Sequence, residues 1–159
     1  MKIVNLRQIK ETRWSSPRKK FGGSSKELSV ALGRVPASTD LRKRHPFDVE
    51  ILRLRPGQTP YPYHSHSAQW EFYHVLSGRG LVRHRGGRSR IKAGDAFIFP
   101  PDQPHTLHND GSTDLVISVV ADNPVGESCH YPDSQKWIVR SPRRRLIRSE
   151  PLDYYDGEE

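Results

Sequence analysis

Short apolar stretches separated by turn residues constrain the fold more than any other feature of this sequence. They cover residues 47–55, 72–76, 81–84, 88–92, 96–99 and 115–120. Gly86-Gly87 and Asp110-Gly111 stand where tight hairpins would turn, and the region has no helical periodicity. Regularly spaced strands punctuated by glycine and proline are typical of a β-sandwich or barrel. We therefore expect an all-β fold with this region as its core.

The segments on either side of this region are more polar. A chain of 159 residues is long enough for one domain with a substantial core, and the hydrophobic fraction of 33% suggests a modest core with polar extensions. We expect an N-terminal extension with edge strands over residues 1–46, a barrel core over 47–122 and a C-terminal extension over 123–159.

Local patterns predict several further elements. Residues 2–9 could form a short edge strand, and the glycine and serine content of residues 14–25 predicts a loop. Apolar residues at every second position of 27–35 predict a half-buried strand. In residues 47–55 the apolar positions change face after Ile51, which predicts a β-bulge.

The chain is basic overall, with 26 lysines and arginines against 18 acidic residues and a formal net charge of +8. Short basic clusters occupy residues 18–20, 42–44 and 143–145, whereas the last ten residues are acidic. Nucleic-acid binding would require stacking aromatics interleaved with the basic residues, or a recognised binding motif, and the sequence has neither. Solvated surface charge is the better interpretation, and we do not expect a nucleic-acid partner.

The cysteine content and the N-terminus bear on the cellular compartment. Cys129 is the single cysteine, so the chain has no internal disulfide and no CxxC pair for zinc. The first ten residues lack the apolar core of a signal peptide, and no stretch has the length of apolar residues that spans a membrane. We expect a cytoplasmic protein with no membrane partner.

Three histidines and one glutamate form a candidate metal site. His64 and His66 are one residue apart, so both imidazoles would point the same way from an extended strand. Glu71 and His105 would complete the set if the fold brings their strands together. Three imidazoles and one carboxylate suit a divalent transition metal such as Mn, Fe, Co, Ni, Cu or Zn. On a six-coordinate ion, two positions would remain for water or a substrate.

These residues and their neighbours resemble the two sequence motifs of the cupin family. The first motif is matched by Gly57, His64, His66, Glu71 and Gly78, with six residues rather than five after Gly57. The second is matched by Gly94, Pro100, His105 and Asn109, with Asp102 in place of the inner glycine. The resemblance covers residues 47–121. Glycine at the position of Asp102 usually serves a conformation with positive φ, which aspartate tolerates better than most residues.

The resemblance implies a double-stranded β-helix, or jelly roll, with a metal held inside the barrel by His64, His66, Glu71 and His105. It does not imply one reaction, because cupins include dioxygenases, decarboxylases, isomerases, sugar-binding modules and seed storage proteins. Residues 123–137 are similar to those of small bacterial cupins described as sugar-phosphate isomerase-like.

Strand parity separates further candidates from bystanders. His74 and His108 have the opposite parity from Glu71 and His105, so we expect them to face away from the metal. Aromatic residues near the ligands more often pack a barrel than bind a substrate, and an arginine before the motif could meet an anion or be solvated. The candidate substrate-binding residues are Tyr63, Gln69, Tyr73, Arg55 and Phe99.

The sequence leaves two classes of function open. The first is a metal-dependent enzyme of isomerase or dioxygenase type that acts on a small polar molecule such as a sugar or sugar phosphate. The alternative is a non-catalytic module that binds a small molecule or carbohydrate. No residue is identified as catalytic. Because exposed sheet edges tend to be covered, we also expect a homodimer, with the N-terminal strands pairing in the same chain or across the dimer.

Overall fold

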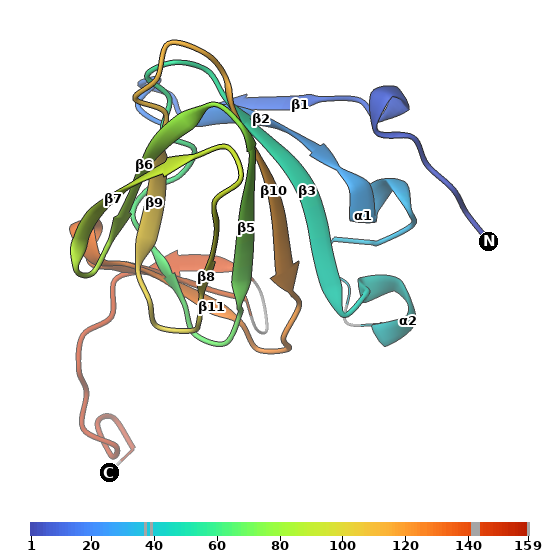
Figure 1. Cartoon of the computed structure of the whole chain (residues 1–159). Helices are drawn as coiled ribbons and strands as arrows, with labels where there is room; N and C mark the ends of the chain where they lie inside the picture. Colours follow the sequence, from blue (N-terminus) through green and yellow to red (C-terminus); the bar gives the residue numbers. More distant parts are fainter. Residues whose placement is uncertain (37, 39, 141–143, 159) are drawn as a thin grey trace.

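The computed structural model describes residues 1–36, 38, 40–140 and 144–158 and shows an all-β protein built around a barrel (Figure 1). Arg143 of the third basic cluster and Glu159 of the acidic terminus lie outside the described residues. The helical elements are η1 (Leu6–Gln8), α1 (Leu28–Ala31), α2 (Leu41–Arg44) and η2 (Pro132–Ser134). Within the described residues, no helix has the length and apolar character needed to cross a membrane.

Among the described residues, thirteen strands form three antiparallel sheets. A six-stranded sheet has the order β1 (Thr12–Ser15), β2 (Gly22–Glu27), β3 (Phe47–Leu54), β10 (Leu115–Asp122), β5 (Glu71–Ser77) and β8 (Ala96–Phe99). A three-stranded sheet has the order β7 (Gly87–Lys92), β6 (Arg79–His84) and β9 (His105–His108). A four-stranded sheet has the order β13 (Arg145–Ile147), β12 (Lys136–Val139), β11 (Ser128–Tyr131) and β4 (Ser65–His66). The expected all-β jelly roll is confirmed.

The barrel interior is apolar at one end and polar at the other. Buried side chains from the first two sheets pack together at the apolar end, and they include Leu52, Leu54, Tyr73, Val75, Val82, Leu107, Leu115 and Ile117. Toward the other end of the six-stranded sheet, Asp48, Glu50 and Glu71 line a cavity. One inner face therefore supplies both the core and the wall of a polar site.

This division explains why the predicted bulge in β3 is wrong. β3 pairs with β10 from Leu54 opposite Leu115 to Phe47 opposite Asp122 without a change of register. The apolar positions change face in the sequence because the inward residues near the start of β3 are acidic and line the cavity. A register irregularity does occur in this sheet, between Val116 and Ile117 of β10 where that strand pairs with β5.

The N-terminal extension differs from the sequence expectation at three places. Residues 2–9 contain the 3-10 turn η1, the loop expected over 14–25 is confined to the turn 16–21 between the paired strands β1 and β2, and residues 28–31 form α1 rather than a strand. Strand β2 is built from small residues because the packing is tight. A Cβ on Gly23 would lie 2.9 Å from Leu54 Cδ2. The β1–β2 hairpin extends the barrel sheet by pairing with β3 in the same chain.

Two tight turns show how the strands are connected. Asp102 has φ of 61°, so the aspartate adopts the left-handed conformation that glycine usually serves. Gly78, between β5 and β6, has φ of +80°, and a Cβ there would lie 2.4 Å from the carbonyl oxygen of Asp114. A side chain at residue 78 would therefore force the turn and the chain beside it apart.

Asn109 ties the end of β9 to two other segments. Its side chain is fully buried and donates to the carbonyl oxygens of Leu54 and Thr113, each at 2.8 Å, while its Oδ1 accepts from the Gly111 amide at 2.9 Å. Replacement by alanine leaves these buried groups without partners, which costs about 1–3 kcal/mol per group. We expect Asn109→Ala to lower the free energy of unfolding by about 2–4 kcal/mol in urea denaturation. Replacing the exposed Asn5 is the control and should change it by under ~1 kcal/mol, because that side chain accepts only one exposed hydrogen bond.

Candidate metal centre

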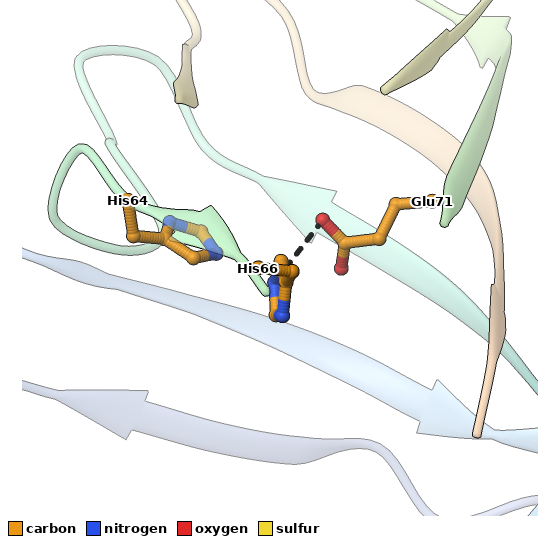
Figure 2. A group of neighbouring side chains, drawn as sticks. All are labelled: His64, His66 and Glu71. Atoms are coloured by element: carbon orange, nitrogen blue, oxygen red, sulfur yellow. Dashed lines mark ion pairs between the residues drawn. The ribbon is translucent and has the colours of Figure 1, made fainter. Parts of the chain in front are cut away.

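Four side chains from three strands meet inside the barrel. His64 forms a backbone bridge with His105, in which the His64 amide donates at 3.1 Å and the His105 amide at 2.8 Å. His66 lies in β4, and Glu71 and His105 begin β5 and β9. The ligand atoms of His64, His66 and Glu71 all lie within 4.8 Å of one another. Figure 2 shows these three side chains gathered at one place. The structure thus brings together the four residues that the sequence proposed as ligands.

Each histidine uses its Nδ1 atom to contact an acceptor outside the cluster. The acceptors are the Pro62 carbonyl for His64, the Glu127 carboxylate for His66 and the Gln103 carbonyl for His105, each at 2.9 Å. An acceptor opposite Nδ1 assigns the proton to that nitrogen. The lone pair of a neutral imidazole is then on Nε2. This fixed tautomer and ring orientation is the one that metal-ligating histidines adopt.

The atoms that face one another at the centre are acceptors. Nε2 of His105 lies 2.8 Å from Oε2 of Glu71, and Nε2 of His66 lies 3.4 Å from the same oxygen. Nε2 of His66 is buried and has no hydrogen-bond partner. A lone pair and a carboxylate oxygen at these separations repel unless a proton or a metal cation lies between them. The donor set and its orphaned nitrogen therefore fit a divalent metal ion.

The electrostatics of the centre favour a cation. Burial lowers the pKa of His64 to about 4, which keeps this imidazole neutral and able to coordinate. Against the effect of burial, the close contact with His105 and the positive charge that the nearby histidines carry when protonated lower the pKa of Glu71 to about 2. Burial is also outweighed at His66, whose hydrogen bonds to Cys129 and Glu127 raise its pKa. The carboxylates of Glu127 and Glu71 thus lie on opposite sides of the His66 ring. A bound metal ion would take the place of the proton on its Nε2 atom.

Glu127 supports the centre from the C-terminal extension, and the sequence did not identify it. This glutamate is 4% exposed, binds Nδ1 of His66 and also accepts from the amides of Ala68 and Gln69 at 2.9 and 3.0 Å. Cys129 lies opposite His66 in the β11–β4 pair, with its Sγ 3.4 Å from Nδ1. The signal in the sequence was that Glu127 and Cys129 are two positions apart and so would share one face of a strand. This signal cannot be interpreted without knowing that β11 pairs with β4.

The contact between Glu127 and His66 leads to a prediction for metal affinity. A carboxylate that accepts the Nδ1 proton fixes the ring and increases its basicity as a ligand. We expect Glu127→Gln to lower the affinity for a divalent metal by about 10–100-fold in a competition titration with a chelator. Asp133→Asn is the control, because that carboxylate is exposed and pairs with Arg83 instead. Equal affinities in all three proteins would contradict the assigned role.

A cavity of about 400 Å³ extends from the four residues toward β2, β3 and the C-terminal strands. Its size is within the range of small-molecule sites. Its lining is polar and aromatic and includes Glu27, Arg34, Glu50, Tyr61, Tyr131 and Arg140. The ring of Tyr131 stacks on His64 with centroids 5.9 Å apart. The C-terminal extension therefore contributes one wall of the cavity.

The five candidate substrate-binding residues do not share one location. Tyr73 and Gln69 line the cavity, and the Tyr73 hydroxyl lies 3.0 Å from Oε2 of Glu71. Phe99 stacks on the His105 ring at 4.0 Å, so it holds that ring in place. Tyr63 faces a second pocket, where Arg83 lies over its ring, and Arg55 is exposed in the loop after β3. Neither Tyr63 nor Arg55 lines the cavity.

The remaining histidines lie outside the cavity, as strand parity predicts for two of them. His74 is paired with Ala96 and Ser118, whereas its neighbours Tyr73 and Val75 face the core. Nδ1 of His108 contacts the Thr59 hydroxyl in the second pocket. His84 is hydrogen-bonded to Ser89 near the β6–β7 turn.

Comparison with known proteins agrees with this architecture. Residues 50–121 match the family model of the cupin domain. Over 69 residues the chain is 34% identical to the oxalate-binding protein of Thermotoga maritima. The aligned stretch covers 43% of this chain and 56% of that protein. The chain thus spans little more than half of this curated relative.

Two solved structures cover nearly the whole chain. One is a candidate sugar phosphate isomerase of Acidithiobacillus ferrooxidans, with 21% identity, a TM-score of 0.79 and coverage of 95% of this chain and 96% of that one. The other is a sugar phosphate isomerase from a cupin superfamily, from Silicibacter pomeroyi, with 23% identity, a TM-score of 0.78 and coverage of 96% and 98%. At these identities the similarity shows a shared fold, and it includes both extensions.

Proposed function

Since the barrel of this chain is a cupin domain, we propose that the barrel holds one divalent transition-metal ion through His64, His66, Glu71 and His105. The protein then acts as an isomerase on a small polar molecule, with a sugar phosphate as the substrate class. The observation that carries the proposal is the buried Nε2 of His66, which has no partner and faces Glu71 while Nδ1 is engaged by Glu127. A metal bound there would supply a Lewis acid for vicinal oxygens of the ligand.

The residues around the centre have defined tasks in this proposal. Pro62, Gln103 and Glu127 fix the orientation of the three imidazoles through their Nδ1 atoms. The hydroxyl of Tyr73 lies within hydrogen-bonding distance of both Glu71 and His105 and positions the carboxylate. Tyr131 and Tyr61 flank His64 and limit access of water from the cavity side.

The polar cavity supports a hydroxylated, anionic substrate. Arginines 34, 140 and 144 and four carboxylates line it, so it offers both donors and acceptors to a polyol. Arg34 is engaged with Asp48 at 3.0 Å, whereas Arg140 and Arg144 lie on the C-terminal wall beside Tyr131. Guanidinium groups bind phosphate well because their donors match its geometry. The two sugar phosphate isomerase structures of the same fold support this substrate class.

A second candidate function is non-catalytic binding of a small dicarboxylate. The 34% identity over 69 residues to a protein described as oxalate-binding favours it. A dicarboxylate could occupy two positions of the ion without any proton transfer. A dioxygenase remains the other enzymatic class that this ligand set permits.

Metal analysis followed by ligand screening tests the proposal. Protein made without a histidine tag should contain about one divalent ion per chain. The metal-loaded form should gain thermal stability with sugar phosphates, because a ligand of the folded state stabilises it. Stabilisation by oxalate without turnover of any sugar phosphate would favour the second candidate. Protein that binds no divalent metal after reconstitution would contradict both.

We also propose that the protein is a homodimer. The outer face of the six-stranded sheet carries exposed apolar side chains, among them Trp70, Phe72 and Ile98 near its β8 edge. Exposed sheet edges and apolar patches are typical of surfaces that other chains cover. Analytical ultracentrifugation that shows a monomer at micromolar concentration would contradict this.

A further inference from the structure

The cavity wall formed by β2 and β3 carries a pair of glutamates that the metal centre does not use. Glu27 and Glu50 are cross-strand partners in the β2–β3 register. Both line the cavity, and Oγ of Ser25 donates to Oε1 of Glu27 at 3.0 Å. Cross-strand partners on one face of a sheet have side chains within about 5 Å of each other. The two carboxyl groups therefore stand together on the inner face of the barrel.

The glutamate pair and the metal centre share one sheet and one cavity. Val119 pairs with Glu50 on one side and with Tyr73 on the other, so Glu50 and Tyr73 lie on the same inner face two strands apart. Strand spacing makes this separation about 10 Å between backbones. The hydroxyl of Tyr73 contacts Glu71. The cavity is thus lined by both the metal centre and the glutamate pair.

The charged groups around the pair do not neutralise it. Within the described part of the chain, no ion pair joins Glu27 or Glu50 to a basic side chain. Arg34 is engaged by Asp48, and Nζ of Lys26 donates to the carbonyl of Leu6. Asp48, Tyr61 and Tyr73 also face Glu50, while Arg140 and Arg144 line the same cavity on its C-terminal wall, beside Tyr131.

Glu50 is therefore a weak acid in this environment. Burial raises its pKa to about 8, helped by the charge of Glu27 and, to a smaller extent, that of Asp48. Two carboxylates that share a buried site without a cation retain a proton between them. A carboxylic acid and a carboxylate side by side can donate one proton and accept another.

We propose that Glu27 and Glu50 share one proton at neutral pH and form the acid–base pair that exchanges protons with a sugar phosphate bound at the metal centre. The inference rests on the proposed isomerase function. An independent sign of a ligand in this cavity is His66, whose side chain is 8% exposed and whose Nε2 has no partner. Neither glutamate belongs to the proposed ligand set.

The proton transfers balance without a redox partner. The carboxylate accepts a proton from the carbon beside the substrate carbonyl, and the C–H electron pair forms the double bond of an enediol. The carboxylic acid donates its proton to the carbonyl oxygen in the same step. In the second step the former carbonyl carbon gains a proton from the pair, and the other hydroxyl returns one. The pair ends with one proton, and the carbonyl has moved by one carbon.

Two measurements on the full, metal-loaded chain test the inference. The first is infrared detection of a protonated carboxyl group at pH 7, comparing wild type with Glu50→Gln and Glu27→Gln. The second is deuterium incorporation from D₂O into glucose 6-phosphate, mannose 6-phosphate and ribose 5-phosphate. Glu11→Gln is the control, since Glu11 pairs with Arg13 and Arg53 away from the cavity. Metal content and melting temperature are measured for every protein.

We expect the carboxylic acid band in wild type and Glu11→Gln and its loss in Glu50→Gln, because Glu50 is the residue whose pKa burial raises. Incorporation should fall by at least about 100-fold in Glu50→Gln and Glu27→Gln, with metal content unchanged, since general acid–base groups contribute about 10²–10⁴-fold. A missing band in wild type at pH 7, or incorporation in both Glu50→Gln and Glu27→Gln within about threefold of wild type, would overturn the inference alone. No incorporation by wild type with any probe would overturn the proposed isomerase function and this step with it.

Discussion

The His66→Ala protein should lose divalent metal binding, with an affinity lower than that of wild type by more than about 100-fold. The substitution removes the imidazole whose Nε2 faces Glu71 and leaves Glu127 buried without its main partner. Changing an outer contact of a ligand already costs about 10–100-fold in affinity, so removing a ligand costs more. Isothermal titration and metal analysis of untagged protein measure the loss directly.

A matched histidine on the outside of the barrel provides the control. His74 lies on β5, three residues beyond Glu71, and does not line the cavity. The His74→Ala protein should bind one ion with the affinity of wild type. Added metal should raise the melting temperature of wild type and His74→Ala but not of His66→Ala, because only a folded site with its ligands gains from binding. Equal metal content in all three proteins would disprove the proposed ligand set.

The barrel was predictable from the sequence because its short apolar strand segments are separated by turn residues at regular intervals. The N-terminal hairpin was not, because β2 begins with two glycines and two serines, and a Cβ on Gly23 would lie 2.9 Å from Leu54 and 3.0 Å from Trp14. Such a strand has the composition of a loop. Its identity depends on its partner strand β3, which local patterns cannot reveal.

The candidate site divides in the same way. His64, His66, Glu71 and His105 follow motifs with characteristic spacing, so their proximity could be predicted before their strands were paired. Glu127 reaches His66 only through the β11–β4 pair, and its segment of the sequence looked irregular.

Glu50 shows a different limit of sequence reasoning. Its position in β3 suggested a change of face, although the strand is regular and the acidic residue points into the cavity. Residues that serve a site rather than the core break the hydrophobic pattern of a strand. The break was visible in the sequence but was attributed to the backbone.

The same glutamate should control how the stability of the protein depends on pH. The pKa of Glu50 is raised from 4.5 to about 8, so the folded state binds this proton more tightly than the unfolded state does. The resulting stabilisation is fully present below about pH 4.5 and is lost as the pH rises through about 8. We expect the free energy of unfolding of Glu50→Gln, relative to wild type, to increase by about 3 kcal/mol between pH 5 and 9.

Urea denaturation of metal-free protein across this pH range measures the effect. The site histidines are the same in wild type and variant, so the difference between the two proteins isolates Glu50 and the groups that face it, namely Glu27, Asp48, Tyr61 and Tyr73. Glu11→Gln should follow the wild-type curve in this range, because, against the effect of burial, the hydrogen bond from Ser24 and the ion pairs with Arg13 and Arg53 lower the pKa of Glu11. A difference between Glu50→Gln and wild type that stays constant from pH 5 to 9 would mean that Glu50 is ionised throughout, and a carboxylate ionised at pH 5 could not hold the shared proton at neutral pH.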